Sequence, residues 1–137
     1  MKLLRLDDWA IGATVTFVAR VQSRDGGGAA TGYRREGNYI TAAQVDTITA
    51  KVYDLSSDTP TTSIQDLPIT SAAIIAAVTN PAAFTIRDPD LGGYNFLFET
   101  IISLIDTAGH RYRVVFEITL TTGTVVEPFA FEAVAAE

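Results

Sequence analysis

The stretch Thr14-Val15-Thr16-Phe17-Val18-Ala19-Arg20-Val21 decides the fold class, because apolar and polar side chains alternate along most of it. Alternation with a period of two is typical of a half-buried β-strand. One face of this strand would carry Val15, Phe17, Ala19 and Val21, and the other Thr14, Thr16, Val18 and Arg20. The stretch therefore predicts a strand over residues 14–21 with one side against a hydrophobic core.

Six further segments predict strands, because β-branched and aromatic residues recur in them between turn-forming residues. They are residues 3–6, 47–53, 63–70, 94–102, 111–121 and 124–134. Segment 63–70 would be a short edge strand that tolerates Pro68, and Thr121-Thr122-Gly123-Thr124 would form the hairpin turn between the last two. Residues 71–78 combine a capping serine with alanines, which predicts one or two helical turns.

About seven short strands in 137 residues favour a single all-β domain over residues 1–137, built as a two-sheet antiparallel β-sandwich. Val, Ile and Thr together supply 41 residues, and such side chains fit a pleated, half-buried surface. The following residues should contribute to the region between the sheets: Phe17, Ile48, Val52, Phe96, Phe98, Val114, Phe116 and Ile118.

Composition excludes several kinds of site. The chain has no cysteine, so thiol nucleophiles, disulfides and thiolate metal sites are absent, and its one histidine, His110, excludes a site that needs two imidazoles. We expect His110 to be a solvated or capping residue without a catalytic role. Asp88 and Asp90 lie two residues apart in a turn, but they lack the further ligands of a calcium loop. Asp25-Gly26-Gly27-Gly28 lacks the spacing and lysine of a phosphate loop. We therefore expect no metal, no cofactor and no enzymatic activity.

The net charge of −6 argues against nucleic acid as a partner, because phosphate binding needs many basic side chains. The charges are unevenly divided. Residues 1–35 hold six basic and three acidic groups, a balance of +3, whereas residues 36–137 hold four basic and thirteen acidic groups, a balance of −9. In a folded monomer this uneven division of charge can be without consequence. In a self-assembling protein it would favour contact between surfaces of opposite charge.

The amino-terminal segment does not predict a signal peptide, because Asp7 and Asp8 interrupt it before an apolar stretch forms. The weakly polar stretch 71–84 is too short, at about 14 residues, to span a bilayer, which takes about 20. These features predict synthesis in the cytoplasm and no membrane partner.

Two segments resemble the tyrosine corner of immunoglobulin-like domains, in which a tyrosine near the start of strand F bonds to upstream backbone. They are Gly109-His110-Arg111-Tyr112-Arg113-Val114 and Asp90-Leu91-Gly92-Gly93-Tyr94-Asn95-Phe96. Only one of the two tyrosines can be the corner. We favour Tyr112 as the structural corner, because a single hairpin strand then follows it as strand G.

Through Val52-Tyr53-Asp54-Leu55 and the two tyrosine segments, the chain is similar to small cysteine-free immunoglobulin-like proteins of phage structural modules. That resemblance implies an immunoglobulin-like fold and a virion component of the decoration, baseplate or tail type. Fold-level similarity carries no site with it.

The interval from Gln22 to Gln44 is unusual, because compact domains seldom use connections longer than about 12–15 residues unless these are functional or disordered. It contains a glycine run and then Tyr33, Arg34, Arg35 and Tyr39, residue types that recur at interface hot spots. We expect this long loop to be an interaction loop that packs on neighbouring subunits of a homo-oligomer or hetero-assembly. An unpartnered surface loop is the alternative for the segment, and a carbohydrate- or cell-surface-binding module is the alternative for the protein.

Overall fold

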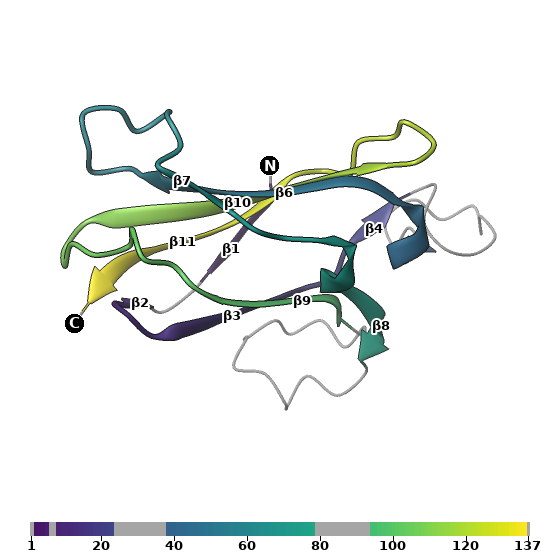
Figure 1. The fold of residues 1–137 in the computed structure, drawn as a ribbon, viewed down its shortest axis with the longest axis horizontal. Helices are drawn as coiled ribbons and strands as arrows, with labels where there is room; N and C mark the ends of the chain where they lie inside the picture. The colour runs from purple at the N-terminus through teal and green to yellow at the C-terminus, as the bar shows by residue number, and fades with distance from the viewer. Residues whose placement is uncertain (1, 6–7, 24–37, 79–93, 137) are drawn as a thin grey trace.

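A computed structural model describes residues 2–5, 8–23, 38–78 and 94–136, and these residues form an all-β structure. Two sheets lie face to face, and a separate pair of short strands stands at one end (Figure 1). Helical structure within the described ranges is confined to two single 3-10 turns, η1 (Ala42–Gln44) and η2 (Ser71–Ala73).

The larger sheet has six strands. Its path runs β1 (Lys2–Arg5), β11 (Phe129–Ala136), β10 (Arg111–Leu120), β6 (Val45–Asp54) and β7 (Gln65–Leu67), and β2 (Trp9–Ala10) also pairs with β11. The pairings of β1 and β2 with β11 are parallel, whereas the other pairings of this sheet are antiparallel. The amino-terminal segment thus runs along the carboxyl-terminal strand.

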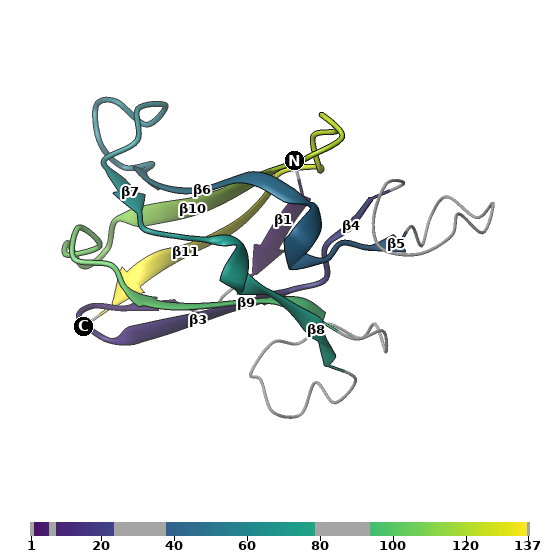
Figure 2. The ribbon, with the colours of Figure 1, turned by 45° about the vertical axis from the view of Figure 1, so that its right-hand side comes forward.

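The smaller sheet has three antiparallel strands in the order β3 (Thr14–Ala19), β9 (Tyr94–Ile101) and β8 (Ile74–Val78). A third sheet consists only of β4 (Gln22–Ser23) and β5 (Asn38–Tyr39), two residues each. Figure 2 shows this pair beyond the end of the other two sheets.

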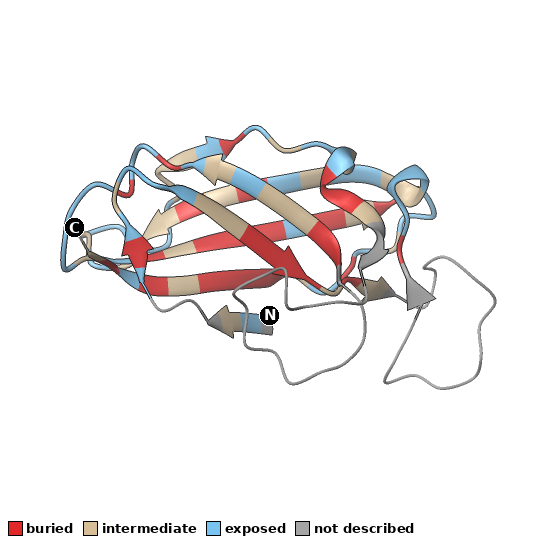
Figure 3. Ribbon diagram, turned by 90° about the horizontal axis from the view of Figure 1, so that it is seen from below, coloured by how far each residue is buried: buried red, intermediate tan, exposed pale blue. Residues whose placement is uncertain are grey.

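The core fills the space between the two larger sheets. Phe17 from the smaller sheet lies 5.1 Å from Phe116 and 4.9 Å from Phe131 of the larger sheet, measured between ring centroids. Along the long strands, buried residues alternate with more exposed ones (Figure 3). All eight core residues predicted from the sequence belong to this cluster, although Ile48 and Phe98 are only partly buried.

Each of the seven strands predicted from the sequence overlaps an observed strand, but the overlap is partial for 63–70 and 124–134, and the described residues hold eleven strands. The expected count of about seven is therefore not confirmed. The four additional strands are β2, β4, β5 and β8, and three of these have only two residues.

The prediction of one or two helical turns over residues 71–78 is wrong for most of that segment. Only Ser71–Ala73 forms a 3-10 turn, capped by the side chain of Thr70, which accepts a hydrogen bond from Ala72 N–H at 3.3 Å. Residues 74–78 form β8 along β9. Ile74, Ile75 and Val78 are β-branched, and pairing with β9 outweighs the helical preference of the alanines.

The predicted hairpin turn at residues 121–124 is confirmed, since Leu120 N–H donates to the Thr124 carbonyl at 2.8 Å. The second strand is interrupted, however. From the Thr119–Val125 bridge to the Phe116–Phe129 pair, three steps along β10 oppose four on the returning chain. This extra residue is a bulge that coincides with Glu127-Pro128, where proline has no N–H to donate.

Candidate interaction surface

The interval from residue 22 to residue 44 is not a plain loop. Its two ends pair as β4 and β5, with Gln22 opposite Tyr39 and Ser23 opposite Asn38. Residues 41–44 add the capped turn η1, in which Gln44 Oε1 accepts from Thr41 N–H at 2.9 Å. The sequence prediction of one continuous loop is therefore corrected. We call residues 22–39 the arm, and its paired ends the stem.

A single buried amide fixes the point at which the arm leaves the domain. Asn95 on β9 is 1% exposed and is the only buried polar or charged residue among those described. Its Oδ1 accepts from Val21 N–H at 2.6 Å, while its Nδ2 donates to the carbonyls of Val21 at 2.9 Å and Ile40 at 3.1 Å. Ile40 N–H in turn donates to the Val21 carbonyl at 3.2 Å.

These bonds fasten both sides of the arm to the smaller sheet, because Val21 immediately precedes the arm and Ile40 immediately follows it. Both side chains are also buried, at 2% and 1% exposure. Buried amides that satisfy backbone groups specify one local conformation, since any other arrangement leaves polar groups unpaired. The stem therefore has a defined position at the end of the domain.

The predicted contact residues are placed only in part. Tyr39 lies in β5, as the register partner of Gln22. Tyr33, Arg34 and Arg35 lie outside the described residues, as do the glycine run, Asp88 and Asp90. The described part of the chain contains no group of three or more His, Asp or Glu side chains that could hold a metal ion.

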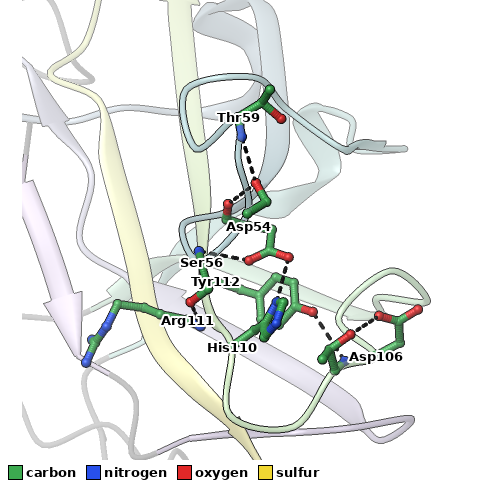
Figure 4. Close-up of polar contacts among 9 residues, drawn as sticks. Asp54, Ser56, Thr59, Asp106, His110, Arg111 and Tyr112 are labelled. Atoms are coloured by element: carbon green, nitrogen blue, oxygen red, sulfur yellow. Dashed lines mark hydrogen bonds and ion pairs between the residues drawn. The ribbon is translucent and has the colours of Figure 1, made fainter.

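Tyr112 makes the upstream contact expected from the sequence. Its ring is 1% exposed, and its hydroxyl accepts a hydrogen bond from Thr107 N–H at 3.2 Å (Figure 4). The contact joins the start of β10 to the loop that precedes it, and Thr107 Oγ1 donates to Asp106 Oδ1 at 3.0 Å in the same loop.

Trp9 is the residue whose role the sequence does not reveal. It is 1% exposed, its Nε1 donates to the Tyr112 carbonyl at 3.1 Å, and its ring packs 5.9 Å from that of Phe17. It lies near the amino terminus, and the parallel pairing of β2 with β11 brings it into the core.

His110 lies beside Asp54, with 2.9 Å between Nδ1 and Asp54 Oδ2 (Figure 4). Asp54 also accepts from Ser56 N–H at 3.0 Å, and Ser56 Oγ accepts from Arg111 N–H at 2.9 Å. These contacts join the loop after β6 to the start of β10. The Ser56 hydroxyl bonds to backbone, and no described hydroxyl contacts the other ring nitrogen of His110. The cluster lacks the serine–histidine contact of a nucleophilic triad.

The contribution of the Tyr112 hydroxyl to stability can be tested by removing the hydroxyl. We expect Tyr112→Phe to lower the free energy of unfolding by about 0.5–1.5 kcal/mol, because one net hydrogen bond is lost and Thr107 N–H loses its partner. Denaturant unfolding measures the change, with Tyr53→Phe on the half-buried Tyr53 as the control. Equal stabilities of Tyr112→Phe and the unaltered chain would contradict the assigned contact.

Comparisons with protein families, curated proteins and solved structures found no match to this chain. None of the helical segments that the structure describes has the length and apolar character required to cross a membrane.

Proposed function

We propose that the protein is a non-enzymatic structural subunit of a larger assembly, built on an immunoglobulin-like domain that presents the arm to neighbouring subunits. By its resemblance to phage structural modules, the assembly would be a virion. The partners would be other virion subunits, without nucleic acid or membrane contacts.

The order of strands supports the immunoglobulin-like part of this proposal. In domains of the variable type, strands C, F and G form one sheet with C′, and strands B, E and D form the other. If β3 is strand B, β6 is C, β7 is C′, β8 is D, β9 is E, β10 is F and β11 is G, the observed neighbours follow this order. Tyr112 then lies near the start of strand F, the position of a tyrosine corner.

The observation that carries the functional proposal is the fixed stem. A floppy surface loop needs no buried amide at its base, whereas a contact segment gains affinity when its ends are positioned before binding. Figures 1 and 2 place β4 at the end of the domain opposite to the carboxyl terminus, where a neighbour can approach it. The arm contains Tyr33, Arg34 and Arg35, residue types suited to interfaces because Arg forms planar, bidentate contacts and stacks on rings.

The carbohydrate-binding alternative has less support. Sugar sites need exposed aromatic faces gathered on one surface, but Trp9 and Tyr112 are both only 1% exposed. Two of the six Trp and Tyr residues in the chain are therefore unavailable for stacking on a ligand.

Removal of residues 25–37 tests the proposal. The paired strands and the Asn95 contacts lie outside that interval, so we expect the shortened chain to fold with nearly unchanged thermal stability and to be lost from purified particles. Quantification of tagged protein in purified particles measures incorporation.

Two substitution variants sharpen this test. Replacement of Tyr33, Arg34 and Arg35 together by serine should reduce incorporation strongly. Replacement of Thr61 and Thr62, which are exposed in the loop after β6, by serine should leave incorporation unchanged. Undiminished incorporation of the shortened chain would show that the arm is not the contact.

A further inference from the structure

Two loops lie at the end of the domain that holds the carboxyl terminus, and we call them the loop end. They are residues 55–64, between β6 and β7, and residues 102–110, between β9 and β10. Figures 1 and 2 show β4 at the opposite end of the domain. The loop end and the stem therefore lie at the two ends of the long strands.

Hydrogen bonds fix the positions of the two loops. Arg111 N–H, directly after the second loop, donates to Ser56 Oγ in the first loop at 2.9 Å. Leu104 N–H, within the second loop, donates to Gln65 Oε1 on β7 at 3.3 Å. A surface that is ordered before binding loses less entropy when a partner docks on it.

The loop end exposes apolar side chains. Ile105 N–H donates to the Ile102 carbonyl at 3.3 Å, which closes a tight turn, and both of these side chains are buried. Leu104 in this turn is nevertheless 41% exposed, and Ile101, which ends β9 just before the turn, is 57% exposed. They are two of the five large apolar side chains that are exposed in the described part of the chain.

The charges of the loop end are negative. Its two loops contain Asp58 and Asp106 but no Lys or Arg. Both carboxylates are exposed, and neither forms an ion pair with any residue that the structure describes. The arginine that follows the second loop, Arg111, bonds to Glu132 on β11 at 3.4 Å. A partner of the loop end would therefore be basic and would carry an apolar or aromatic side chain.

We propose that the arm of one copy of the chain docks on the loop end of the next copy. This inference rests on the proposed function and names the partner of the arm. The arm contains Tyr33, Arg34 and Arg35, which are one aromatic ring and two guanidinium groups in succession. They complement the exposed apolar side chains and the two unpaired carboxylates of the loop end.

The contact joins two copies, because these residues cannot reach the loop end of their own chain. β10 begins at the loop end, has ten residues and ends beside Gln44, so it separates the two ends by about 30 Å at 3.3 Å per residue. Tyr33 precedes Asn38 of the stem by five residues, which at about 3.6 Å per residue allows at most about 18 Å between them.

A contact between unlike ends repeats from copy to copy. Each copy that offers its arm to one neighbour still offers its loop end to another, so the assembly closes into a ring or grows as a filament. The subunit would thus form a repeating array through a single kind of contact.

Charge reversal at the loop end tests the docking. We expect the unaltered protein to self-associate in sedimentation equilibrium, with a dissociation constant that rises with salt. Asp58→Lys together with Asp106→Lys, the loop-end variant, should raise that constant about tenfold or more, because like charges then face the arginines. Glu117→Lys together with Glu127→Lys makes the same change of charge at exposed positions outside the loop end and should leave the constant unchanged. Thermal unfolding verifies that these variants fold.

A mixture of two defective variants distinguishes this contact from a symmetric one. The arm variant, which combines Tyr33→Ser, Arg34→Ser and Arg35→Ser, keeps its loop end, and the loop-end variant keeps its arm. Each alone should be largely monomeric. Mixed together they should form a one-to-one complex that grows no further, because one functional arm and one functional loop end remain to meet.

Four results would overturn the docking: a monomer at every concentration up to about 1 mM, unaltered association of the loop-end variant, equal weakening by the control variant, or a mixture without the one-to-one complex. Incorporation into particles separates this docking from the proposed function. If the loop-end variant enters particles normally and the arm variant does not, the arm contacts a different subunit, so the docking is wrong and the proposed function stands. If the arm variant also enters normally, both are wrong.

Discussion

Phe116→Ala should lower the free energy of unfolding by about 3–5 kcal/mol, the range for truncation of a fully buried phenylalanine. Phe116 is 0% exposed and lies between rings of both sheets. Its ring centroid is 5.0 Å from that of Phe96 on β9, 5.1 Å from that of Phe17 on β3 and 5.3 Å from that of Phe129 on β11. Alanine would remove these contacts and leave a cavity at the centre of the core.

Urea unfolding followed by far-ultraviolet circular dichroism measures this change. A loss of this size is a large part of the roughly 5–15 kcal/mol that stabilises a typical domain. Val125→Ala is the matched truncation on the surface, because Val125 is 62% exposed, and it should change stability by less than about 0.5 kcal/mol. A similar small effect of Phe116→Ala would mean that the two sheets do not pack through this ring.

The strands that the sequence predicts well are those in which alternation and burial coincide. In residues 14–19, Phe17 and Ala19 point into the core as expected, because the period of two places them on one face. Val18 on the opposite face is buried as well, at 2% exposure. The period of the sequence does not reveal the burial of Val18, because that burial depends on what covers the other side of the sheet.

The elements that the sequence missed or misassigned are short, and their structure depends on pairing with distant parts of the chain. Residues 74–78 are a strand because β9, some twenty residues later, is beside them. Trp9 enters the core because β2 pairs with the last strand, and its indole bonds to backbone 103 residues away. Local propensity contains no information on such pairings, so tertiary contacts decide them.

The arm, too, is only partly predictable from the sequence. Its length, glycines and Tyr and Arg residues mark it as unusual in the sequence. The stem and its fastening do not follow from those residues, because the residue that holds them is Asn95, on a strand 55 positions beyond Ile40. In the sequence, Asn95 is only a polar residue between Tyr94 and Phe96.

Asn95→Ala should lower the free energy of unfolding by about 2–4 kcal/mol, because it leaves buried backbone groups of Val21 and Ile40 without partners. Hydrogen exchange gives a local measure. The amide of Val21, which donates directly to Asn95 Oδ1, should exchange much faster in the variant than in the unaltered chain. Amides in the middle of β10 should change only as far as global stability does.

Asn95→Asp separates the donor and acceptor roles of this side chain. The carboxylate keeps an acceptor for Val21 N–H, but it has no donor for the Val21 and Ile40 carbonyls and would place a buried charge against them. We therefore expect it to destabilise the protein at neutral pH at least as much as alanine does. Thr16→Ala removes an exposed side-chain bond to Glu99 from the same sheet and should change stability by less than about 1 kcal/mol. If Asn95→Ala proves as mild as Thr16→Ala and leaves the exchange of Val21 unchanged, the buried amide does not fix the stem, and the arm loses the positioned base on which its proposed role rests.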